Sequence, residues 1–324
     1  MAGVHALVLA AGRGTRLDPL TRLVAKAAVP LAGPTLVERA IDWLGRQAIT
    51  DVVVNLHHRP ETITAVLGDG RHLGCRIRYS WEQPILGSAG GPRHALDLLD
   101  SDPFLIVNGD TLCDLPLAPM VEAHARTGAD VTMAVVPNPA PRHYNGLVLD
   151  DEDRVTGVVP AGQAAGTWHF IGIQVARHAV LAPLADGTPA ESVSGVYRDA
   201  MTRRPGSIRG WRLTLPCVDV GTPEDYRQAA LSLAAAGAAG SLVEAGAELD
   251  PSARIVRSVV WPGARVGAGV EVEDSVVAGA VRVPAGLRIR RSVVVPAGVV
   301  RSGDDAAVHD GVAIFPMGSR TLSA

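Results

Sequence analysis

The chain has 324 residues, of which 47% are hydrophobic and 19% charged, a composition that excludes a disordered chain and allows two folded domains. Its formal net charge of −3 gives no reason to expect nucleic acid or an anionic membrane as the main partner. Cys75, Cys113 and Cys217 are odd in number and far apart, so they predict no disulfide framework. No segment resembles a signal peptide or reaches the length of a transmembrane span, and we expect a soluble cytoplasmic protein.

Segments with strand-like and helix-like patterns alternate along the first two-thirds of the chain. Such alternation predicts an α/β fold, in which a Rossmann-like mixed, mainly parallel sheet carries helices on both faces. Ligands of such sheets bind at the carboxyl ends of the strands, where the loops converge. We expect strands at residues 6–10, 52–56, 76–79 and 104–107, and helices from Thr35 (in capping-box spacing with Glu38), at 60–67 and at 92–99.

A glycine-rich turn, Gly12-Arg-Gly-Thr-Arg-Leu17, follows the first predicted strand directly. Glycines let the backbone approach a ligand, and successive N–H groups form a concave site for an anion. The turn is not a dinucleotide fingerprint, because Leu17 takes the place of the third glycine, and the nearest lysine is too distant for a Walker loop. Taken alone, the turn is equally well explained as a tight connection between a strand and a helix.

The single lysine of the chain, Lys26, lies shortly after this turn, whereas arginine occupies every other basic position. An ammonium group is a compact charge on a flexible stem and is suited to reaching one phosphate oxygen in a crowded site. The position of Lys26 therefore supports a phosphate-binding role for this part of the chain.

The pattern changes after about Thr222. An alanine-rich helix is expected from Pro223 to about Ala236, followed by a linker at 237–247. Beyond it the sequence repeats every seventeen residues, since Arg257-Ser-Val-Val260 recurs at 274–277 and again at 291–294. Apolar residues in strides of five and six indicate a hexapeptide-type repeat, and we expect a left-handed parallel β-helix with its tail over residues 248–324.

The string Gly-x-Gly-Thr-Arg-Leu-x-Pro-Leu-Thr, with Lys26 and Pro30 after it, resembles the sugar-phosphate nucleotidyltransferases, also called nucleoside-diphosphate-sugar pyrophosphorylases. The resemblance extends to about Tyr226 and implies a catalytic domain over residues 1–236. In that family the turn wraps a nucleoside triphosphate. The resemblance implies that Arg16 binds the phosphates and that Lys26 neutralises charge near the reacting phosphate.

Three further segments resemble the family in the same order along the chain. The loop from Glu82 to Gly90 is similar to the base-recognition loop, and Asn108-Gly-Asp110 and Val218–Pro223 are similar to the segments that supply two metal carboxylates, here Asp110 and Asp219. Each aspartate taken alone is as well explained as a turn or helix cap. The resemblance implies these nucleotide-binding residues: Ala10, Ala11, Gly12, Gly14, Thr15, Arg16, Glu82, Gly87, Ser88, Asn108 and Gly109.

The implied reaction joins a nucleoside triphosphate and a sugar 1-phosphate. A phosphate oxygen of the sugar phosphate attacks the α-phosphorus in line, and pyrophosphate leaves without a protein nucleophile. Mg²⁺ held by Asp110 and Asp219 would bridge phosphates. Arg16, Lys26 and Asp110 are the predicted catalytic residues, because positioning and charge neutralisation carry the rate.

The sugar side departs from the family pattern. Many members carry a Glu-Lys-Pro triplet for the sugar and its phosphate, which is absent from Val155–Gly162, and Trp168-His-Phe-Ile-Gly172 replaces an Asn-Ala-Gly strand. Tyr144-Asn-Gly146 does resemble the Tyr-Gly segment of the family, in which the glycine N–H meets the sugar. The predicted sugar-binding residues are Gly146, His169 and Glu191, with Arg142, His143 and His169 as candidates for the missing phosphate contact, although a lone histidine is more often structural.

The sequence leaves open the nucleobase, the sugar and the role of the β-helix. The β-helix and the Leu-Gly-Ser-Ala-Gly loop favour GTP and mannose 1-phosphate, whereas the Trp-His-Phe-Ile-Gly strand resembles N-acetylmuramate 1-phosphate uridylyltransferases; another hexose-1-phosphate uridylyl- or thymidylyltransferase is a further alternative. The missing Glu-Lys pair also fits a regulatory paralogue that binds nucleotide sugars. An acyltransferase role for the β-helix has only His309 to support it, so we expect the β-helix to form a homo-oligomer.

Overall fold

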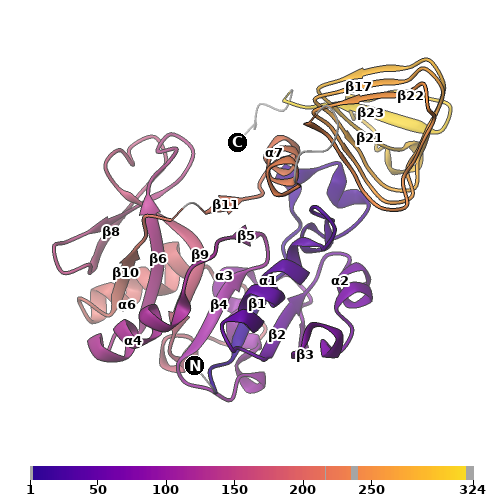
Figure 1. Ribbon diagram of the computed structural model, residues 1–324. Helices are drawn as coiled ribbons and strands as arrows, with labels where there is room; N and C mark the ends of the chain where they lie inside the picture. Colours follow the sequence, from indigo (N-terminus) through magenta and orange to yellow (C-terminus); the bar gives the residue numbers. More distant parts are fainter. Residues whose placement is uncertain (1–2, 216, 235–239, 319–324) are drawn as a thin grey trace. The chain divides into compact units, whose positions relative to one another are not determined.

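The computed structural model describes residues 3–215, 217–234 and 240–318 (Figure 1). The chain divides into two compact units that are each discontinuous in sequence. The sheet unit comprises Met1–Gly12 and Val37–Asp219, and the coil unit comprises Arg13–Leu36 and Val220–Ala324. The segment that contains Arg16 and Lys26 thus groups with the C-terminal repeat, and not with the sheet that precedes and follows it.

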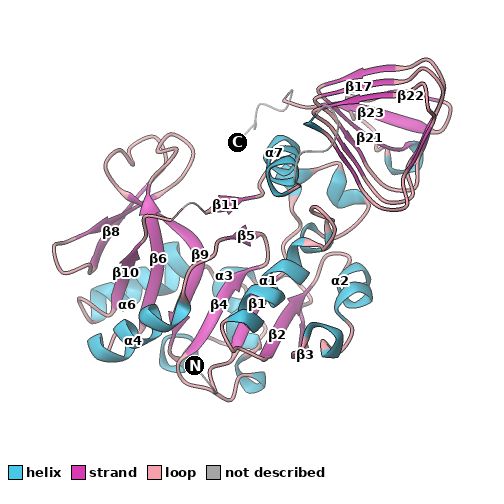
Figure 2. Cartoon of the chain, in the orientation of Figure 1, coloured by secondary structure: helices cyan, strands magenta, loops and turns pink. Residues whose placement is uncertain are grey.

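The sheet unit is built on a nine-stranded mixed sheet with the strand order β10-β6-β9-β4-β1-β2-β3; in addition, β7 pairs with β9, and β8 pairs with β7 (Figures 1 and 2). The predicted strands at 6–10, 52–56, 76–79 and 104–107 are confirmed as β1 to β4, which run parallel. The bounds are β1 Ala6–Leu9, β2 Asp51–Leu56, β3 Arg76–Trp81, β4 Phe104–Asn108, β6 Val131–Pro137, β7 Gly146–Leu149, β8 Val155–Val159, β9 Trp168–Ala176 and β10 Ile208–Arg212.

Helices pack against this sheet and enclose an apolar core that includes Leu7, Val53, Phe104 and Ile106. The predicted helices after Thr35 and at 60–67 are confirmed as α1 and α2. In the described residues no helix is long and apolar enough to cross a membrane. The bounds are α1 Leu36–Arg46, α2 Pro60–Leu67, η4 Arg71–Leu73, α3 Gly87–His94, η5 Leu96–Leu98, α4 Leu117–Thr127, α5 His178–Leu181, η6 Ser192–Val196 and α6 Tyr197–Arg203.

The helix predicted at 92–99 is wrong in its position. Helix α3 begins at Gly87, so Pro92 lies inside it, and the chain then forms the separate 3-10 turn η5. Gly87 has a φ of +76°, a left-handed conformation that glycine adopts without strain. A glycine at this position lets the chain turn into the helix five residues before the proline that the sequence marked as the start.

A small antiparallel ladder joins β5, Thr111–Leu112, to β11, Val218–Asp219. Directly beside it, Cys113 and Cys217 form a disulfide with their Cα atoms 4.6 Å apart. The prediction that the cysteines imply no disulfide is therefore wrong for this pair, whereas Cys75 is a buried free thiol. The pairing could not be predicted from the sequence, because the cysteines are 104 residues apart and come together through the ladder of β5 and β11.

The coil unit begins with three 3-10 turns, η1 Thr15–Leu17, η2 Leu20–Arg22 and η3 Lys26–Ala28, and continues with α7, Pro223–Leu233. Helix α7 has Thr222 as its N-cap, with Pro223 in the first turn, as the sequence predicts. Thr222 and Asp225 form a capping box, in which the side chain of each accepts from the backbone N–H of the other. The predicted end of this helix near Ala236 lies outside the described residues.

The C-terminal repeat forms stacked coils of short parallel strands, as expected for a β-helix (Figure 2). Each ladder is offset by seventeen residues, so that Val259 pairs with Val276 and Val276 with Val293. Valine side chains fill the interior, and an antiparallel hairpin of β22 and β23 ends the stack. The strands lie at β12 Leu242–Val243, β13 Glu248–Leu249, β14 Arg254–Val256, β15 Val259–Val260, β16 Arg265–Val266, β17 Glu271–Glu273, β18 Val276–Val277, β19 Arg282–Val283, β20 Arg288–Arg290, β21 Ser292–Pro296, β22 Ala307–His309 and β23 Val312–Pro316, with the turn η8 at Ala297–Val299.

Strand β12 lies within the stretch predicted as a linker, where it pairs with β15. A buried serine recurs in each coil: the Ser258 hydroxyl accepts from Ser275 N at 3.0 Å, and that of Ser275 accepts from Ser292 N at 3.0 Å. The repeated Ser-Val-Val motif is therefore explained by one polar ladder beside the valine core. His309 is exposed on the terminal hairpin.

Candidate functional site

The carboxyl end of β1 is held by a residue that the sequence reasoning missed. The buried Asn55, at the end of β2, accepts from the backbone N–H groups of Ala10 and Ala11 at 2.6 and 3.3 Å. Its amide nitrogen donates to Glu82 Oε1 at 2.6 Å. The predicted nucleotide-binding residues Ala10 and Ala11 are thus anchored to the next strand. A single polar residue near the end of the apolar run Val52–Leu56 was the available signal.

The carboxylate of Glu82 accepts hydrogen bonds from other groups of the protein. Its second carboxylate oxygen accepts from Leu86 N at 2.8 Å, and the residue is only 5% exposed. Both oxygens therefore receive hydrogen bonds from the chain itself. The predicted nucleotide-binding residue Glu82 is placed to fix the loop that leads into α3 and to connect that loop to Asn55.

Two groups of predicted residues meet at the start of α3. Ser88 donates from Oγ to Glu191 Oε2 at 2.6 Å, and Ser192 N donates to Ser88 Oγ at 2.9 Å. A side chain on Gly87 would meet the same carboxylate, 2.8 Å from Oε1. The structure thus brings the base-side residues Gly87 and Ser88 into contact with Glu191, which the sequence reasoning assigned to the sugar.

The Asn108-Gly-Asp110 segment follows β4, next to the end of β1. Gly109 N donates to Leu9 O at 2.9 Å. The side chain of Asn108 packs directly on the backbone of Gly172 in β9, which leaves no room for a Cβ there. Gly172, noted in the sequence only as part of an unusual strand, therefore sets the place of Asn108.

The β5–β11 ladder places the backbone positions of the two predicted metal ligands close to one another. Thr111 is paired with Asp219, and Asp110 immediately precedes Thr111 (Figure 1). Among the described residues no group of three or more His, Cys, Asp or Glu side chains is arranged to hold a metal ion. Two carboxylates from nearby backbone positions nonetheless suit Mg²⁺, which is commonly held by one or two carboxylates together with substrate phosphates and water.

The predicted sugar-binding residues Gly146 and His169 lie on adjacent strands, β7 and β9. The rings of His169 and Tyr144 are 4.3 Å apart, and the side chain of Thr167 fills the space above Gly146. Burial lowers the pKa of His169 from its usual value. The neutral imidazole is therefore favoured, which argues against His169 as the cation that replaces the missing phosphate-binding lysine. Arg142 and His143 are exposed in the loop before Tyr144.

In the coil unit, the glycine turn and Lys26 are in direct contact. Gly14 has a φ of +60°, and a Cβ there would lie 2.9 Å from both Lys26 Cβ and Thr21 Cγ2. Thr21 Oγ1 donates to Gly14 O at 3.2 Å. Both the backbone conformation and the close approach require glycine, so the turn and the lysine form one structural element.

Arg16 lies against the segment that precedes α7. A Cβ on Gly221 would be 3.0 Å from Arg16 Nη1 and 3.2 Å from Asp225 Oδ2. Arg16 and Thr15 also line a cavity of about 440 Å³, together with residues of α7 and the end of the β-helix. Three carboxylates line this cavity beside the single arginine, which makes it unsuited to a triphosphate. Its lining residues are Thr15, Arg16, Asp18, Pro19, Thr222, Pro223, Glu224, Val293, Asp305, Phe315, Pro316, Met317 and Gly318.

Comparisons with known proteins show the family to which the chain is similar. Residues 5–235 match the family model described as nucleotidyl transferase. The chain is 31% identical over 267 residues to a mannose-1-phosphate guanylyltransferase of Mycobacterium tuberculosis, covering 79% of this chain and 74% of that protein. It is 32% identical over 165 residues to a UTP–glucose-1-phosphate uridylyltransferase of Synechocystis sp., covering 47% of this chain and 42% of that one.

Among solved structures, that of HddC from Yersinia pseudotuberculosis superposes with a TM-score of 0.61 and 20% identity, covering 71% of this chain and 99% of that one. The same protein has been solved in complex with GMP-PN. At this identity the likeness concerns the fold, and it supports the predicted Rossmann-like sheet.

Proposed function

Because the chain belongs to the nucleotidyl transferase family, we propose that it transfers a guanylyl group from GTP to mannose 1-phosphate or a closely similar sugar 1-phosphate, releasing pyrophosphate. The observation that carries the choice of substrates is the 31% identity to a mannose-1-phosphate guanylyltransferase along 79% of this chain. The family supplies the reaction class, and the relative's name supplies the base and the sugar.

In this proposal the cationic side chains, the base-side loop and the carboxylates have different roles. Arg16 and Lys26 would supply positive charge to the triphosphate, and the loop from Glu82 to Gly90 would contact the base. Asp110 and Asp219 would hold Mg²⁺, which would neutralise phosphate charge when bound. Since the sugar phosphate itself is the nucleophile, these residues act by positioning and by stabilising charge in the transition state.

The sugar would be bound on the side of β7 and β9. Gly146 would offer its backbone, His169 would act as a neutral hydrogen-bonding partner, and Glu191 would accept from sugar hydroxyls through its exposed carboxylate. Of the three candidates for the sugar phosphate, Arg142, His143 and His169, we prefer Arg142, which is exposed and two residues before Tyr144. A guanidinium group can bind a phosphate in a bidentate manner, so it can take over the role of the absent lysine.

A uridylyltransferase of hexose 1-phosphates is the second candidate. The Synechocystis relative favours it, but over only 47% of this chain. The experiment that decides measures pyrophosphate release with Mg²⁺ while crossing several nucleoside triphosphates with a panel of sugar 1-phosphates. We expect the highest kcat/KM with GTP and mannose 1-phosphate. A preference for UTP or dTTP would show that the proposed base is wrong. Binding of nucleotide sugars without any turnover would favour a regulatory paralogue.

A further inference from the structure

The segment Arg13–Leu36 has little regular structure of its own. It contains three 3-10 turns of three residues each, and such turns make few and poorly aligned internal hydrogen bonds. Its conformation therefore depends on the groups it contacts. Within the coil unit, those contacts lead to α7 and to the β-helix.

The first contact is a relay of two hydrogen bonds that begins in the β-helix. Trp261 donates from Nε1 to Tyr226 Oη at 2.7 Å, and Tyr226 donates to Pro30 O at 2.8 Å. Trp261 is 3% exposed and Tyr226 fully buried, so the two bonds are shielded from water. The relay fixes the backbone four residues after Lys26.

The second contact is a buried arginine between Arg16 and Lys26 in the sequence. Arg22 donates to both oxygens of Asp304 and to Val299 O at 3.0 Å, all beyond the last coil. On its other side it forms a bidentate pair with Asp18, with both distances 2.6 Å. The side chains of Arg22 and Asp304 are 4% and 6% exposed. Because the buried guanidinium binds all of these partners at once, it holds the turn η2 in one position.

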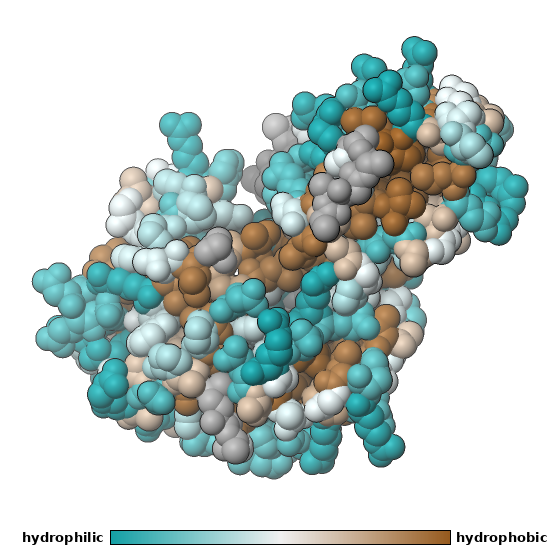
Figure 3. Space-filling view, viewed as in Figure 1, coloured by the Kyte–Doolittle hydropathy of each residue, from teal (hydrophilic) through white to brown (hydrophobic). Residues whose placement is uncertain are grey.

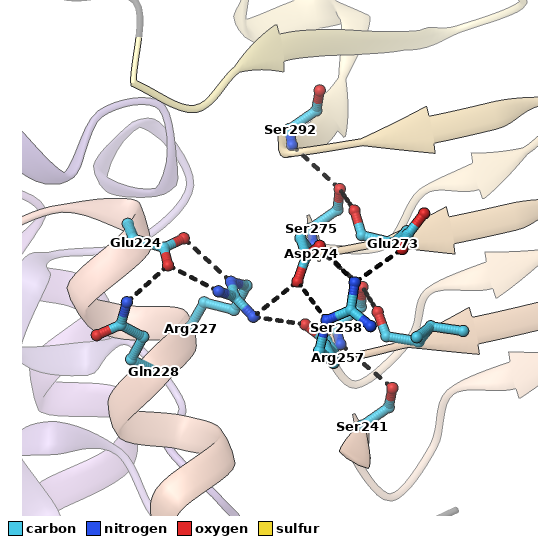
Figure 4. A network of polar contacts seen from close by, with 11 residues as sticks. Glu224, Arg227, Gln228, Ser241, Arg257, Ser258, Glu273, Asp274, Ser275 and Ser292 are labelled. Carbon is cyan, nitrogen blue, oxygen red and sulfur yellow. Dashed lines mark hydrogen bonds and ion pairs between the residues drawn. The ribbon is translucent and has the colours of Figure 1, made fainter. Parts of the chain in front are cut away.

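The third contact joins Gly33 to Glu244, whose two carboxylate oxygens accept from Gly33 N at 3.1 and 3.0 Å. Beyond these direct bonds, α7 is itself tied to the β-helix (Figure 4): Arg227 donates to Arg257 O at 2.7 Å and lies 3.6 Å from Asp274 Oδ1. The N-terminus of α7 follows Gly221, against which Arg16 packs. The β-helix thus supports the segment directly and through α7.

We propose that the β-helix holds the phosphate-binding segment in its working conformation, with Trp261, Asp304 and Glu244 as positioning residues for nucleotidyl transfer. The inference rests on the proposed function, because it assigns the segment to binding the triphosphate. It changes the role of the repeat from an appended oligomerisation domain to a required part of the nucleotide site.

The test compares two full-length variants with a matched control. Trp261→Phe removes the indole N–H but keeps an aromatic ring, and Asp304→Asn removes the charge that faces Arg22. Arg265→Ala is the control, because Arg265 is half-exposed on the same β-helix and, among the described residues, forms an ion pair with Glu248 at the surface. Each variant is assayed for GTP affinity with Mg²⁺, for the KM of each substrate, for melting temperature, and for hydrogen exchange over residues 13–36.

We expect Trp261→Phe to weaken GTP binding about three- to tenfold, the effect of one lost hydrogen bond, and Asp304→Asn to weaken it more. Exchange over residues 13–36 should rise while the KM of the sugar 1-phosphate stays unchanged. Lowered melting temperatures with unchanged GTP affinity and unchanged exchange in this segment would overturn the proposal. Absence of turnover in the wild-type protein would count against the proposed function alone, since hydrogen exchange needs no substrate.

Discussion

At the scale of single residues, the site depends on groups that other side chains hold in place. Lys26 lies against Gly14, and the Ala10 and Ala11 backbone N–H groups bond to Asn55. In each case a short polar or glycine residue fixes a group predicted to meet the triphosphate. Electrostatic stabilisation of a transition state requires such fixed charges, because reorienting them during the reaction would raise the barrier.

Lys26→Ala should lower kcat by about two to three orders of magnitude, since removing one preorganised charged group raises the barrier by on the order of 3 kcal/mol. The melting temperature should change little, because Lys26 is only half-buried. Lys26→Arg restores the charge but not the compact shape, and we expect it to recover only part of the rate. Steady-state kinetics with GTP in excess provide the measurement; an unchanged kcat in Lys26→Ala would remove this residue from the mechanism.

His124, on α4, gives the sheet unit a dependence on pH. It is fully buried, with Nδ1 2.9 Å from Thr132 Oγ1, and burial together with nearby Arg177 lowers its pKa to about 4. The unfolded chain therefore binds more protons than the folded chain between about pH 4 and 6.5. Stability should be fully present above pH 6.5 and fall by about 3 kcal/mol as the pH drops towards 4.

Urea midpoints between pH 5 and 7.5 test this expectation. His124→Gln should be less stable at pH 7.5 and should show a shallower fall towards pH 5 than the wild type. His72→Gln, at an exposed position in η4, is the control and should keep the wild-type slope. An identical pH slope in His124→Gln and wild type would mean that other groups cause the dependence.

At the scale of elements, the two-residue ladder of β5 and β11 has the largest functional consequence. It pairs residues 106 and 108 positions apart in sequence, and it is closed on one side by the Cys113–Cys217 disulfide. The ladder sets Asp219 opposite Thr111, next to Asp110. Two strands this short are not stable alone, so the disulfide and the neighbouring β9 hold them.

Asp219→Asn should raise the Mg²⁺ concentration needed for half-maximal activity at least about tenfold, because a carboxylate ligand is lost. Asp114→Asn, whose side chain is 85% exposed just beyond the same strand, should leave it unchanged. Binding of Mn²⁺ in the presence of GTP, followed by electron paramagnetic resonance, gives a readout independent of turnover. Equal metal affinity in both variants would remove Asp219 from the proposed metal site.

The same elements show what can be predicted from this sequence. Strands β1 to β4 could be predicted because their apolar runs are continuous. Asp110 and Asp219 each lie in a recognisable motif, and their role as metal ligands stays a prediction. Asn55 could not be assigned, since its role depends on β1 and β2 being neighbours in register. The roles of Tyr226 and Trp261 could not be predicted either. Their hydrogen bond joins a helix to a coil 35 residues later, and no local sequence pattern indicates it.

At the scale of the whole molecule, the β-helix has a second expected role in self-association. Its six-stranded sheet ends in β12 and β22, and the edge residues Val243 and Val308 are 41% and 54% exposed. Figure 3 shows apolar side chains gathered over this domain among polar ones. Exposed apolar edges favour pairing with another chain, so we propose a homo-oligomer through the β-helix.

Sedimentation of the full chain should therefore give a mass above that of one chain, and Val243→Glu with Val308→Glu should lower it. Truncation after Ala236 is a poorer test, because it also removes Trp261 and Asp304 from the segment that carries Arg16. A single-chain mass for the unmodified protein would reject the oligomer. The variants should retain GTP affinity, which separates association from support of the nucleotide site.

The discontinuous coil unit also has a consequence for how the protein is made. Leu36 leaves the ribosome 225 residues before Trp261 and still longer before Asp304. At about 5–20 residues per second, residues 13–36 wait on the order of ten to fifty seconds for their supporting contacts. During synthesis the nascent sheet can fold first, while the cations proposed to bind the triphosphate remain without their supporting contacts. On the proposed role of the β-helix, the nucleotide site would be complete only after Asp304 has been synthesised, so that chains terminated before this residue would not sequester GTP.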